Sequence, residues 1–322
     1  MRPILSICIP TFLDDKSLIN NLSLLSKENS GSIEIIICDD SPNDLILSIV
    51  NEYKDKIPIK YFRGAGEGLD SALIKLIEFS SGKYIWWLGD DSLIPGSVEK
   101  VCKTLSLNKD LIFLWVNSHS IDDGKLTFGD VKSSFFNDRD KLLNYDIGLL
   151  GFITATIFRR NESIKALEKA KNHIDSAFAC LYIILHVLSS KGQIGILGES
   201  CFTSREKPSG EIRWYDQFQV FGINLYDIVN EFDNIFTKSA QRKALAHNLV
   251  KVLKAILVER ALGFTTGFAS KHVSINILFL KYYSFPQFWF FLPLLITPVW
   301  IVTLGYKTFL YSKTKIYFSW HK

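Results

Sequence analysis

Short apolar segments alternate with longer amphipathic ones over the first 117 residues. The apolar runs have strand length, and the segments between them repeat apolar residues every three to four positions, as helices with one buried face do. The expected strands are 4–9, 33–38, 57–62, 84–88 and 111–116, and the expected helices lie near 16–28, 43–55, 69–81 and 96–107. This alternation predicts right-handed βαβ units and a mostly parallel sheet covered on both faces. The fold class is therefore α/β.

Residues 118–235 keep strand and helix signals but separate them by longer loops. Gly, Asp and Ser are frequent in the first part of this region, which is typical of irregular connections. We expect a strand at 152–158, a helix near 175–190 and a short strand at 194–197. This region is therefore expected to complete one domain over 1–235.

The chain changes character at about residue 236. A predicted helix over 239–262 carries leucine and isoleucine on one face and lysine elsewhere. Between Lys281 and Lys307 there are then 25 consecutive uncharged residues, enough to cross a bilayer core, which needs about 20. Three prolines interrupt a straight helix, so a transmembrane segment, a re-entrant hairpin and an in-plane helix all remain open. A buried helical pair of a soluble domain is the alternative.

The net charge of +4 is unevenly distributed. Residues 236–322 contain twelve Lys or Arg and one acidic residue, a net charge of +11, so residues 1–235 carry −7. Because the basic residues alternate with apolar and aromatic ones, an anionic membrane surface is a better partner than nucleic acid. The five cysteines form no C-x-x-C pair and the N-terminus shows no signal-peptide pattern, so we expect a reducing, cytoplasmic environment.

The residues that directly follow the first four expected strands have ligand-binding chemistry. They are Pro10 and Thr11, Asp39 and Asp40, Arg63 and Gly64, and Asp90 and Asp91. Ligands of parallel α/β sheets bind at the carboxyl ends of the strands, so these residues are expected at one edge. Carboxylates there can hold a divalent cation or accept ribose hydroxyls, and an arginine can neutralise phosphate. A nucleoside diphosphate suits that edge, whereas each acidic pair alone can also be a turn or a helix cap.

Four segments carry a resemblance to a known family. They are Ser6-Ile-Cys-Ile-Pro-Thr11, Glu34-Ile-Ile-Ile-Cys-Asp-Asp-Ser41, Gly68-Leu-Asp-Ser-Ala72 and Gly82-Lys-Tyr-Ile-Trp-Trp-Leu-Gly-Asp-Asp-Ser92. Their order and spacing resemble those of family 2 glycosyltransferases with the GT-A fold, through roughly residue 105. Residues 86–91, with Gly151-Phe-Ile-Thr-Ala-Thr-Ile-Phe158, more narrowly resemble the abequosyltransferase-like branch that builds bacterial O-antigens and other surface polysaccharides.

The resemblance implies roles for the strand-end residues. Pro10, Thr11 and Asp39 would contact the nucleoside of a sugar nucleotide, and Arg63 is a candidate for the phosphates. Asp90 and Asp91 would be the family's DxD-type pair, with Asp90 supporting the ribose and Asp91 the divalent metal, Mg²⁺ or Mn²⁺. Ser92 stands where many relatives have a further Asp, so either the metal is bound with modest affinity or Asp91 is its only direct protein ligand.

The resemblance also implies an inverting displacement, in which a carboxylate removes the proton of the acceptor hydroxyl. In relatives this base begins a helix in the second half of the domain, and Asp175 occupies the comparable place. His173 is the second candidate, and Glu199 the third. A helix N-cap is the alternative role of Asp175. The pair Arg213-Trp214 resembles a motif that closes the site in some membrane-bound relatives, although the Gln that opens that motif is replaced by Gly210.

The expected protein is a metal-dependent hexosyl- or deoxyhexosyltransferase of surface polysaccharide synthesis. Its donor half would be about 1–117, its acceptor half 118–235, and 236–322 a helical, membrane-associating extension. The acceptor would be a polyprenyl-diphosphate-linked oligosaccharide at the cytoplasmic face of the bacterial inner membrane, with the protein peripheral or inserted through its C-terminal segment. A non-catalytic sugar-nucleotide-binding or scaffold protein is the alternative.

Other enzyme classes find less support. The glycines of 64–68 could suggest a dinucleotide site, but the third glycine of G-x-G-x-x-G would fall at Leu69, and the turn follows the third strand instead of the first. The dispersed histidines have no zinc-ligand spacing, and neither a G-x-S-x-G nor a P-loop motif occurs. Hydrolase and kinase functions are therefore not indicated.

Overall fold

The computed structural model describes residues 2–28, 31–121, 124–204, 216, 218–262 and 275–308. These residues belong to two compact units. Unit 1 comprises Met1–Tyr145, Leu149–Glu206 and Glu231–Thr237, and unit 2 comprises Asp146–Gly148, Lys207–Asn230 and Lys238–Lys322. The boundary expected at 235 lies beside the start of the last large segment of unit 2, and unit 2 also takes in 207–230.

Unit 1 contains one mixed β-sheet, with nine strands among the described residues. The strands are β1 (Leu5–Thr11), β2 (Ile33–Asp39), β3 (Ile59–Arg63), β4 (Tyr84–Trp87), β5 (Ser92–Leu93), β6 (Leu111–Ser120), β7 (Ser134–Phe136), β8 (Thr156–Arg159) and β9 (Gln193–Ser204). Their order is β3-β2-β1-β4-β8-β6-β9-β5, with β7 on β9. The first four strands are parallel, and β8 runs antiparallel between β4 and β6.

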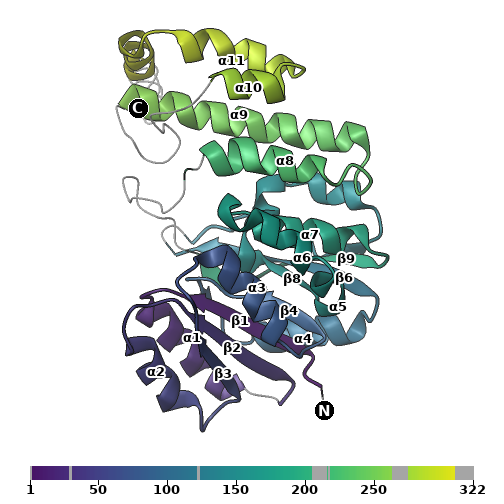
Figure 1. Cartoon of the computed structure of the whole chain (residues 1–322). Coiled ribbons are helices and arrows are strands. Elements are labelled where there is room, and N and C mark those ends of the chain that lie inside the picture. Colours follow the sequence, from purple (N-terminus) through teal and green to yellow (C-terminus); the bar gives the residue numbers. More distant parts are fainter. Residues whose placement is uncertain are drawn as a thin grey trace, which may run out of the picture. The chain divides into compact units, whose positions relative to one another are not determined.

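Helices of unit 1 cover both faces of this sheet (Figure 1). They are α1 (Asp15–Glu28), α2 (Leu45–Tyr53), α3 (Leu69–Phe79), α4 (Ser97–Leu107), α5 (Arg160–Ile164), α6 (Leu167–Ala170) and α7 (Ala179–Ser189). The steps from β1 to β2 and from β2 to β3 go the same way along the sheet, so right-handed crossovers place α1 and α2 on one face, where they contact each other. The step back to β4 places α3 on the other face, with α5 and α7.

The second half of unit 1 departs from the expected elements in two places. Only the end of the run 152–158 is a strand, because Ile153–Ala155 forms a 3-10 turn whose Thr154 carbonyl accepts the indole N–H of Trp86 at 2.8 Å. The helix expected near 175–190 begins only at Ala179. A separate 3-10 turn, η4 (Lys171–Ser176), precedes it because Ala177 adopts a left-handed conformation with φ of 57°.

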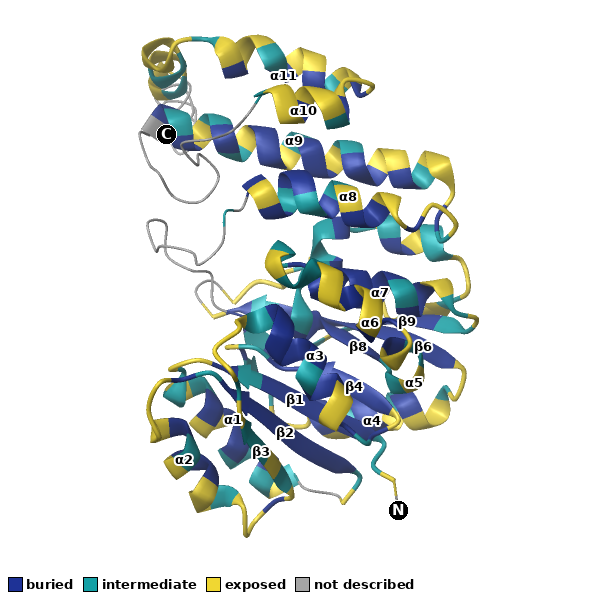
Figure 2. Cartoon of the chain, viewed as in Figure 1, coloured by how far each residue is buried: buried dark blue, intermediate teal, exposed yellow. Residues whose placement is uncertain are grey.

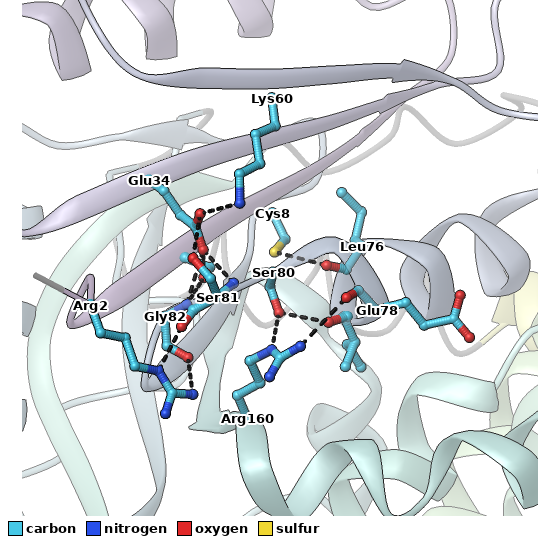
Figure 3. A network of polar contacts seen from close by, with 12 residues as sticks. Arg2, Cys8, Glu34, Lys60, Leu76, Glu78, Ser80, Ser81, Gly82 and Arg160 are labelled. Atoms are coloured by element: carbon cyan, nitrogen blue, oxygen red, sulfur yellow. Dashed lines mark hydrogen bonds and ion pairs between the residues drawn. The ribbon is translucent and has the colours of Figure 1, made fainter.

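A buried carboxylate links three segments at the edge of the sheet where β2 begins (Figure 3). Oε1 of Glu34 accepts hydrogen bonds from the Ser6 hydroxyl at 2.6 Å and from the amides of Ser81 and Gly82 at 2.5 and 2.9 Å. Oε2 accepts the Lys60 ammonium and the Ser81 hydroxyl, each at 2.8 Å. Burial alone raises the pKa of Glu34, but these hydrogen bonds outweigh it and lower the pKa to about 2. The network holds the α3–β4 connection against β1 and β2.

Unit 2 is helical in the part that the structure describes. After the π-helical turn Phe218–Asn224 come α8 (Leu225–Asn230), α9 (Lys238–Leu262), α10 (Ile275–Tyr282) and α11 (Pro286–Ile296), and a further helix covers 299–308. The expected apolar face of α9 is present, since Leu245, Leu249 and Leu253 are buried. α9 contacts both α11 and the turn Phe218–Asn224.

The apolar residues that follow α9 are divided between a buried and an exposed side. Phe288, Phe291 and Leu295 of α11 are buried, whereas Phe290 is 74% and Trp300 69% exposed. Figure 2 shows how frequent exposed positions are on α10 and α11. No single helix among the described residues is long and apolar enough to cross a membrane. Pro286–Ile296 and Val299–Thr308 satisfy the length and hydropathy criteria only as a pair, bent by 105°.

Candidate functional site

The strand register aligns three of the expected site residues. Thr11 of β1 is opposite Asp39 of β2, and Asp39 is opposite Arg63 of β3. All three lie at the carboxyl ends of parallel strands, where the sequence placed them. On the other side of β1, the Leu88 amide donates to the Cys8 carbonyl at 2.9 Å, so the chain leaves β4 beside β1 just before Asp90.

Asp39 is completely buried, and its carboxylate is compensated inside the protein. Oδ1 accepts the Ser41 amide at 2.8 Å, and Oδ2 accepts the Tyr61 hydroxyl at 2.8 Å and pairs with Arg63 at 2.9 Å. Burial and the bond to Asp39 raise the pKa of Tyr61 to about 12, so the phenol remains a donor. Asp39 is therefore fixed, and its remaining lone pairs are the ones a ligand can use.

Arg63 is occupied by the same corner of the fold. Besides Asp39, its guanidinium donates to the carbonyls of Ser41 and Asn43 at 2.6 and 2.8 Å and pairs with Asp44 at 2.6 Å. A phosphate group would have to replace these partners. In this arrangement Arg63 orders the loop after β2, and its contact with a phosphate stays a prediction.

The end of β1 offers unsatisfied polar and exposed apolar groups side by side. The Thr11 side chain is 8% exposed, and its buried hydroxyl makes no hydrogen bond among the described residues. Buried hydroxyls are nearly always hydrogen-bonded, so this oxygen marks a place for a ligand's polar group. Pro10 precedes it, half-buried, and Phe12 follows with 64% of its side chain exposed. Phe12 was not singled out in the sequence.

Asp90 and Asp91 differ sharply in their surroundings. Asp90 is exposed, and its carbonyl accepts the Ser17 hydroxyl at 3.0 Å. Asp91 is 7% exposed, and the hydroxyl of Thr154 donates to its carboxylate. The same Thr154 hydroxyl accepts the Gly89 amide at 3.1 Å. Thr154 therefore fixes the Asp91 side chain, and it lies in the motif Gly151–Phe158 that the sequence had marked without assigning it a role.

The electrostatics of this corner favour a cation. Burial raises the pKa of Asp91 to about 7; the Thr154 hydrogen bond opposes this, while the carboxylates of Asp90 and Asp14 add to it. The pKa of Asp14 is also raised, first by burial. Among the described residues no group of three or more His, Cys, Asp or Glu side chains could hold a metal ion by itself. Mg²⁺ commonly takes only one or two carboxylates and completes its shell with substrate phosphates and water, so Asp90 and Asp91 fit it.

Asp175 lies in η4, on the face of the sheet that carries α3 and α7, and its side chain is exposed. Because α7 begins at Ala179, Asp175 does not cap that helix. His173 stacks on Tyr182 with ring centroids 4.6 Å apart and lies 3.4 Å from Glu231. Glu199 forms an ion pair with Lys100 on the surface. Asp175 is therefore the least engaged of the three candidates, and Arg213 and Trp214 lie outside the described residues.

The glycine-rich loop that follows β3, residues 64–68, is hydrogen-bonded to the end of β2. The Gly64 amide donates to the Asp39 carbonyl at 2.9 Å, and the Gly66 amide to the Asp40 carboxylate at 3.2 Å. Gly66 and Gly68 have positive φ, so the loop needs glycine at both positions. The loop leads directly into α3 at Leu69.

This combination of a mostly parallel α/β sheet and a polar site at the strand ends is typical of the GT-A fold. Residues 6–167, half of the chain, match the model of the family Glycosyl transferase family 2. The chain belongs to this family. It has a GT-A-like α/β fold with C-terminal helices.

Two curated relatives are similar over short regions. Chondroitin synthase of Escherichia coli is 26% identical over 122 residues, which are 37% of this chain and 18% of that protein. Chondroitin synthase of Pasteurella multocida is 31% identical over 81 residues, 25% of this chain and 8% of that protein. The match therefore covers less than a fifth of either relative.

Solved structures extend the likeness to the fold of nearly the whole chain. S. aureus TarS 1–349 in complex with UDP superposes with a TM-score of 0.62 at 15% identity, covering 96% of this chain and 92% of that one. Its complex with UDP-GlcNAc gives 0.61 at 13% identity, covering 86% and 80%. The mannosyltransferase PcManGT of Pyrobaculum calidifontis, in complex with GDP-Man and Mn²⁺, gives 0.51 at 12% identity, covering 94% and 88%.

Proposed function

We propose that this chain transfers a hexosyl or deoxyhexosyl group from a nucleoside diphosphate sugar to a lipid-linked oligosaccharide, with inversion at the anomeric carbon. The observation that carries the proposal is the convergence of an unsatisfied Thr11 hydroxyl, a fixed Asp39 carboxylate and a buried Asp91, whose carboxylate receives the Thr154 hydroxyl and has no cation beside it among the described residues, at one edge of the sheet. Similar folds that bind UDP, UDP-GlcNAc and GDP-Man support a sugar nucleotide as the ligand of that edge.

The nucleoside would bind at the ends of β1 and β2. Pro10 and the exposed Phe12 offer apolar surface to the base, the Thr11 hydroxyl offers its unused hydrogen bond, and Asp39 accepts from the base. Asp90 would support the ribose. Asp91, together with Asp90, would hold a Mg²⁺ or Mn²⁺ ion, which when bound neutralises charge on the departing nucleoside diphosphate.

The acceptor hydroxyl is proposed to lose its proton to the Asp175 carboxylate. Its oxygen then forms the new bond to the anomeric carbon, while the bond from that carbon to the diphosphate oxygen breaks and its electron pair leaves with the nucleotide. The exposure of Asp175 supports this role, because a base must reach the acceptor. His173 and Glu199 are less suited, since each already has a charged partner.

The acceptor is proposed to be a polyprenyl-diphosphate-linked glycan at the cytoplasmic face of a bacterial inner membrane. Support comes from unit 2, where α11 has only 11 residues, about 16 Å of helix, against a bilayer core of about 30 Å. A bend of 105° separates α11 from the helix over 299–308, and we call this bent pair the hairpin. The bend suits insertion in the plane of the membrane better than a straight crossing. Exposed aromatic side chains and a net charge of +11 over 236–322 favour an anionic lipid surface.

The narrower likeness of residues 86–91 and 151–158 to abequosyltransferase-like enzymes supports a role in O-antigen or related surface polysaccharide synthesis. Thr154, which holds Asp91, lies within the second of these segments. The proposal therefore favours deoxysugar donors among those to be tested.

A donor screen tests the proposed activity. The full chain is incubated with UDP-, GDP-, CDP- and dTDP-sugars, Mg²⁺ or Mn²⁺ and a polyprenyl-diphosphate-linked acceptor, and released nucleoside diphosphate is measured. We expect release with one donor class that depends on the acceptor and is lost in Asp91→Asn. Binding of a sugar nucleotide without release across the whole panel would contradict transfer and favour a non-catalytic binding role.

A further inference from the structure

Asp70 is a buried carboxylate that the proposed donor site does not use. It lies in the first turn of α3, directly after the glycine-rich loop, and is 3% exposed. Oδ1 accepts the amide of Ala179, the first residue of α7, at 3.2 Å. Oδ2 is buried and makes no hydrogen bond with any described residue. A carboxylate buried with one oxygen unbonded is costly, so its place in the fold needs an explanation beyond packing.

The backbone that Asp70 holds is the one that presents Asp175. Between Asp175 and Ala179 the chain passes through Ala177 in the left-handed region, which residues with a Cβ atom rarely adopt. Such a conformation persists only where its surroundings hold it. The Ser176 hydroxyl contributes by donating to the His173 carbonyl at 2.6 Å and accepting the Phe178 amide at 3.0 Å.

The charge of Asp175 also influences the pKa of Asp70. Burial raises the pKa of Asp70 to about 7; the amides of Ala179 and Ala177 oppose this, and the charge of Asp175 adds to it. The two carboxylates come from different halves of unit 1, α3 following the donor-side loop and η4 preceding α7. Asp70 therefore links the donor side of the site to the turn that carries the proposed base.

We propose that Asp70 is a positioning residue, which anchors the junction between η4 and α7 and thereby fixes the place of the Asp175 carboxylate. This inference rests on the proposed function of Asp175 as the base. Asp70 itself does not touch substrate, because it is buried beneath the turn. Its loss should lower the rate of the chemical step and leave donor binding unchanged.

Three variants of the full chain test this inference. Asp70→Leu removes both acceptors at similar volume, Asp70→Asn keeps an acceptor for the Ala179 amide, and Glu34→Gln weakens a buried network at the opposite edge of the sheet. With the donor found in the screen, we expect Asp70→Leu to lower kcat by about 10- to 100-fold with KM for the donor within about twofold. Asp70→Asn should have a kcat within about fivefold of the wild type. Glu34→Gln should have the wild-type kcat when it is assayed at a temperature below the melting temperature of the variant.

Hydrogen exchange provides a readout that needs no substrate. We expect the amides of Ala177 to Ala179 to exchange about 10-fold faster in Asp70→Leu, with β1 and β2 unchanged and with protection restored in Asp70→Asn. If Asp70→Leu does not fold, Asp70→Ala serves in both measurements.

The outcomes separate this inference from the proposed function. Asp175→Asn should lose about 100-fold or more in kcat. If it does, while Asp70→Leu keeps its kcat or changes only the KM for the donor, the positioning role is wrong. If Asp175→Asn keeps its kcat, the base assignment fails instead, and unchanged exchange at Ala177 to Ala179 would then overturn the anchoring role as well.

Discussion

Buried acidic side chains of this protein differ in how completely the fold compensates their charge. Glu34 receives five hydrogen bonds, and Asp39 is fixed by an amide, a phenol and a guanidinium. Asp91 receives the Thr154 hydroxyl and otherwise faces two more carboxylates, Asp90 and Asp14. Well-compensated carboxylates stabilise a fold, whereas a poorly compensated one at a strand end indicates that a ligand supplies what is missing.

Asp91→Asn should abolish transfer without harming the fold. The substitution removes a metal-binding charge, so we expect kcat/KM to fall by at least about 100-fold. It also removes a buried charge that its neighbours repel, so the melting temperature, measured in the presence of a chelator, should be no lower than that of the wild type. Asp15→Asn on the first turn of α1 is the matched control and should keep full turnover. Unchanged turnover in Asp91→Asn would rule out its role in the site.

The lowered pKa of Glu34 predicts that the folded protein becomes less stable in acid. Because its pKa in the folded protein is lowered from 4.5 to about 2, its contribution is complete above about pH 4.5 and is lost as the pH falls toward 2. Glu34→Gln should lower the free energy of unfolding at pH 7 by about 3 kcal/mol, with a much smaller difference near pH 2. Urea unfolding at both pH values measures this. Glu52→Gln, an exposed change on α2, should stay within about 0.5 kcal/mol, and an equal loss in both variants would contradict the prediction.

At the scale of elements, the connections fix the geometry more tightly than the helices and strands do. The α3–β4 connection approaches β1 so closely that a Cβ atom on Gly82 would lie 2.7 Å from the Ser6 amide nitrogen and 3.0 Å from the Leu5 carbonyl carbon. Both neighbours are backbone atoms of a central strand, which cannot yield as a side chain can. The close approach is what lets Glu34 accept the amides of Ser81 and Gly82.

Gly82→Ala should therefore be strongly destabilising for so small a change. We expect a loss of about 2–3 kcal/mol in the free energy of unfolding, because the methyl group must displace β1 or open the Glu34 network. Gly305→Ala is the control, since a Cβ atom there meets nothing within 4 Å. It should leave stability unchanged or slightly improved. Equal denaturation midpoints for Gly82→Ala and the wild type would show that the α3–β4 connection can accommodate a methyl group beside β1.

At the scale of the whole molecule, charge and apolar exposure are separated along the chain. Residues 1–235 carry −7 and residues 236–322 carry +11. Within unit 2, Arg260 donates to the carbonyls of Leu295 and Thr297 at the end of α11, so the bend of the hairpin is held by its own unit. An apolar hairpin with one side packed on α9 and the other exposed is the arrangement expected of a helix pair that rests in a lipid interface.

Membrane association should depend on the exposed apolar side chains of α10, α11 and the helix over 299–308. The triple substitution of Leu280, Phe290 and Trp300 by serine should reduce sedimentation with phosphatidylglycerol-containing vesicles by about 10- to 100-fold, because each side chain contributes transfer energy. Substituting exposed Leu45, Leu107 and Ile121 of unit 1 in the same way is the matched control. Binding should also weaken at high salt and with neutral lipid.

Two results would contradict the membrane surface. The first is equal sedimentation of the two triple variants. The second is that neither protein binds vesicles, while the wild type is a dimer and the triple variant of Leu280, Phe290 and Trp300 is a monomer. The exposed apolar side chains would then join two copies of the chain.

The sequence by itself determined the order of the elements and the edge on which the chemistry lies. Hydrophobic periodicity is a local property, so β1 to β4, their helices and the strand-end positions of Thr11 and Asp39 follow from it, whereas β5 (Ser92–Leu93), which begins directly after Asp91, was not predicted. The family motifs are local as well. The same reasoning predicted the buried face of α9 and the break in the apolar region after Lys281.

Only the tertiary structure decided which side chains meet. Arg63 pairs with Asp39 and Asp44, Thr154 reaches Asp91 across 63 positions of the sequence, and α7 starts four residues after Asp175, beyond the left-handed Ala177. Such contacts depend on register and on long-range packing, which residue patterns do not encode. Asp70 illustrates the difference. In the sequence it is one polar residue of the helix α3, and in the fold its carboxylate accepts the first amide of a different helix, α7.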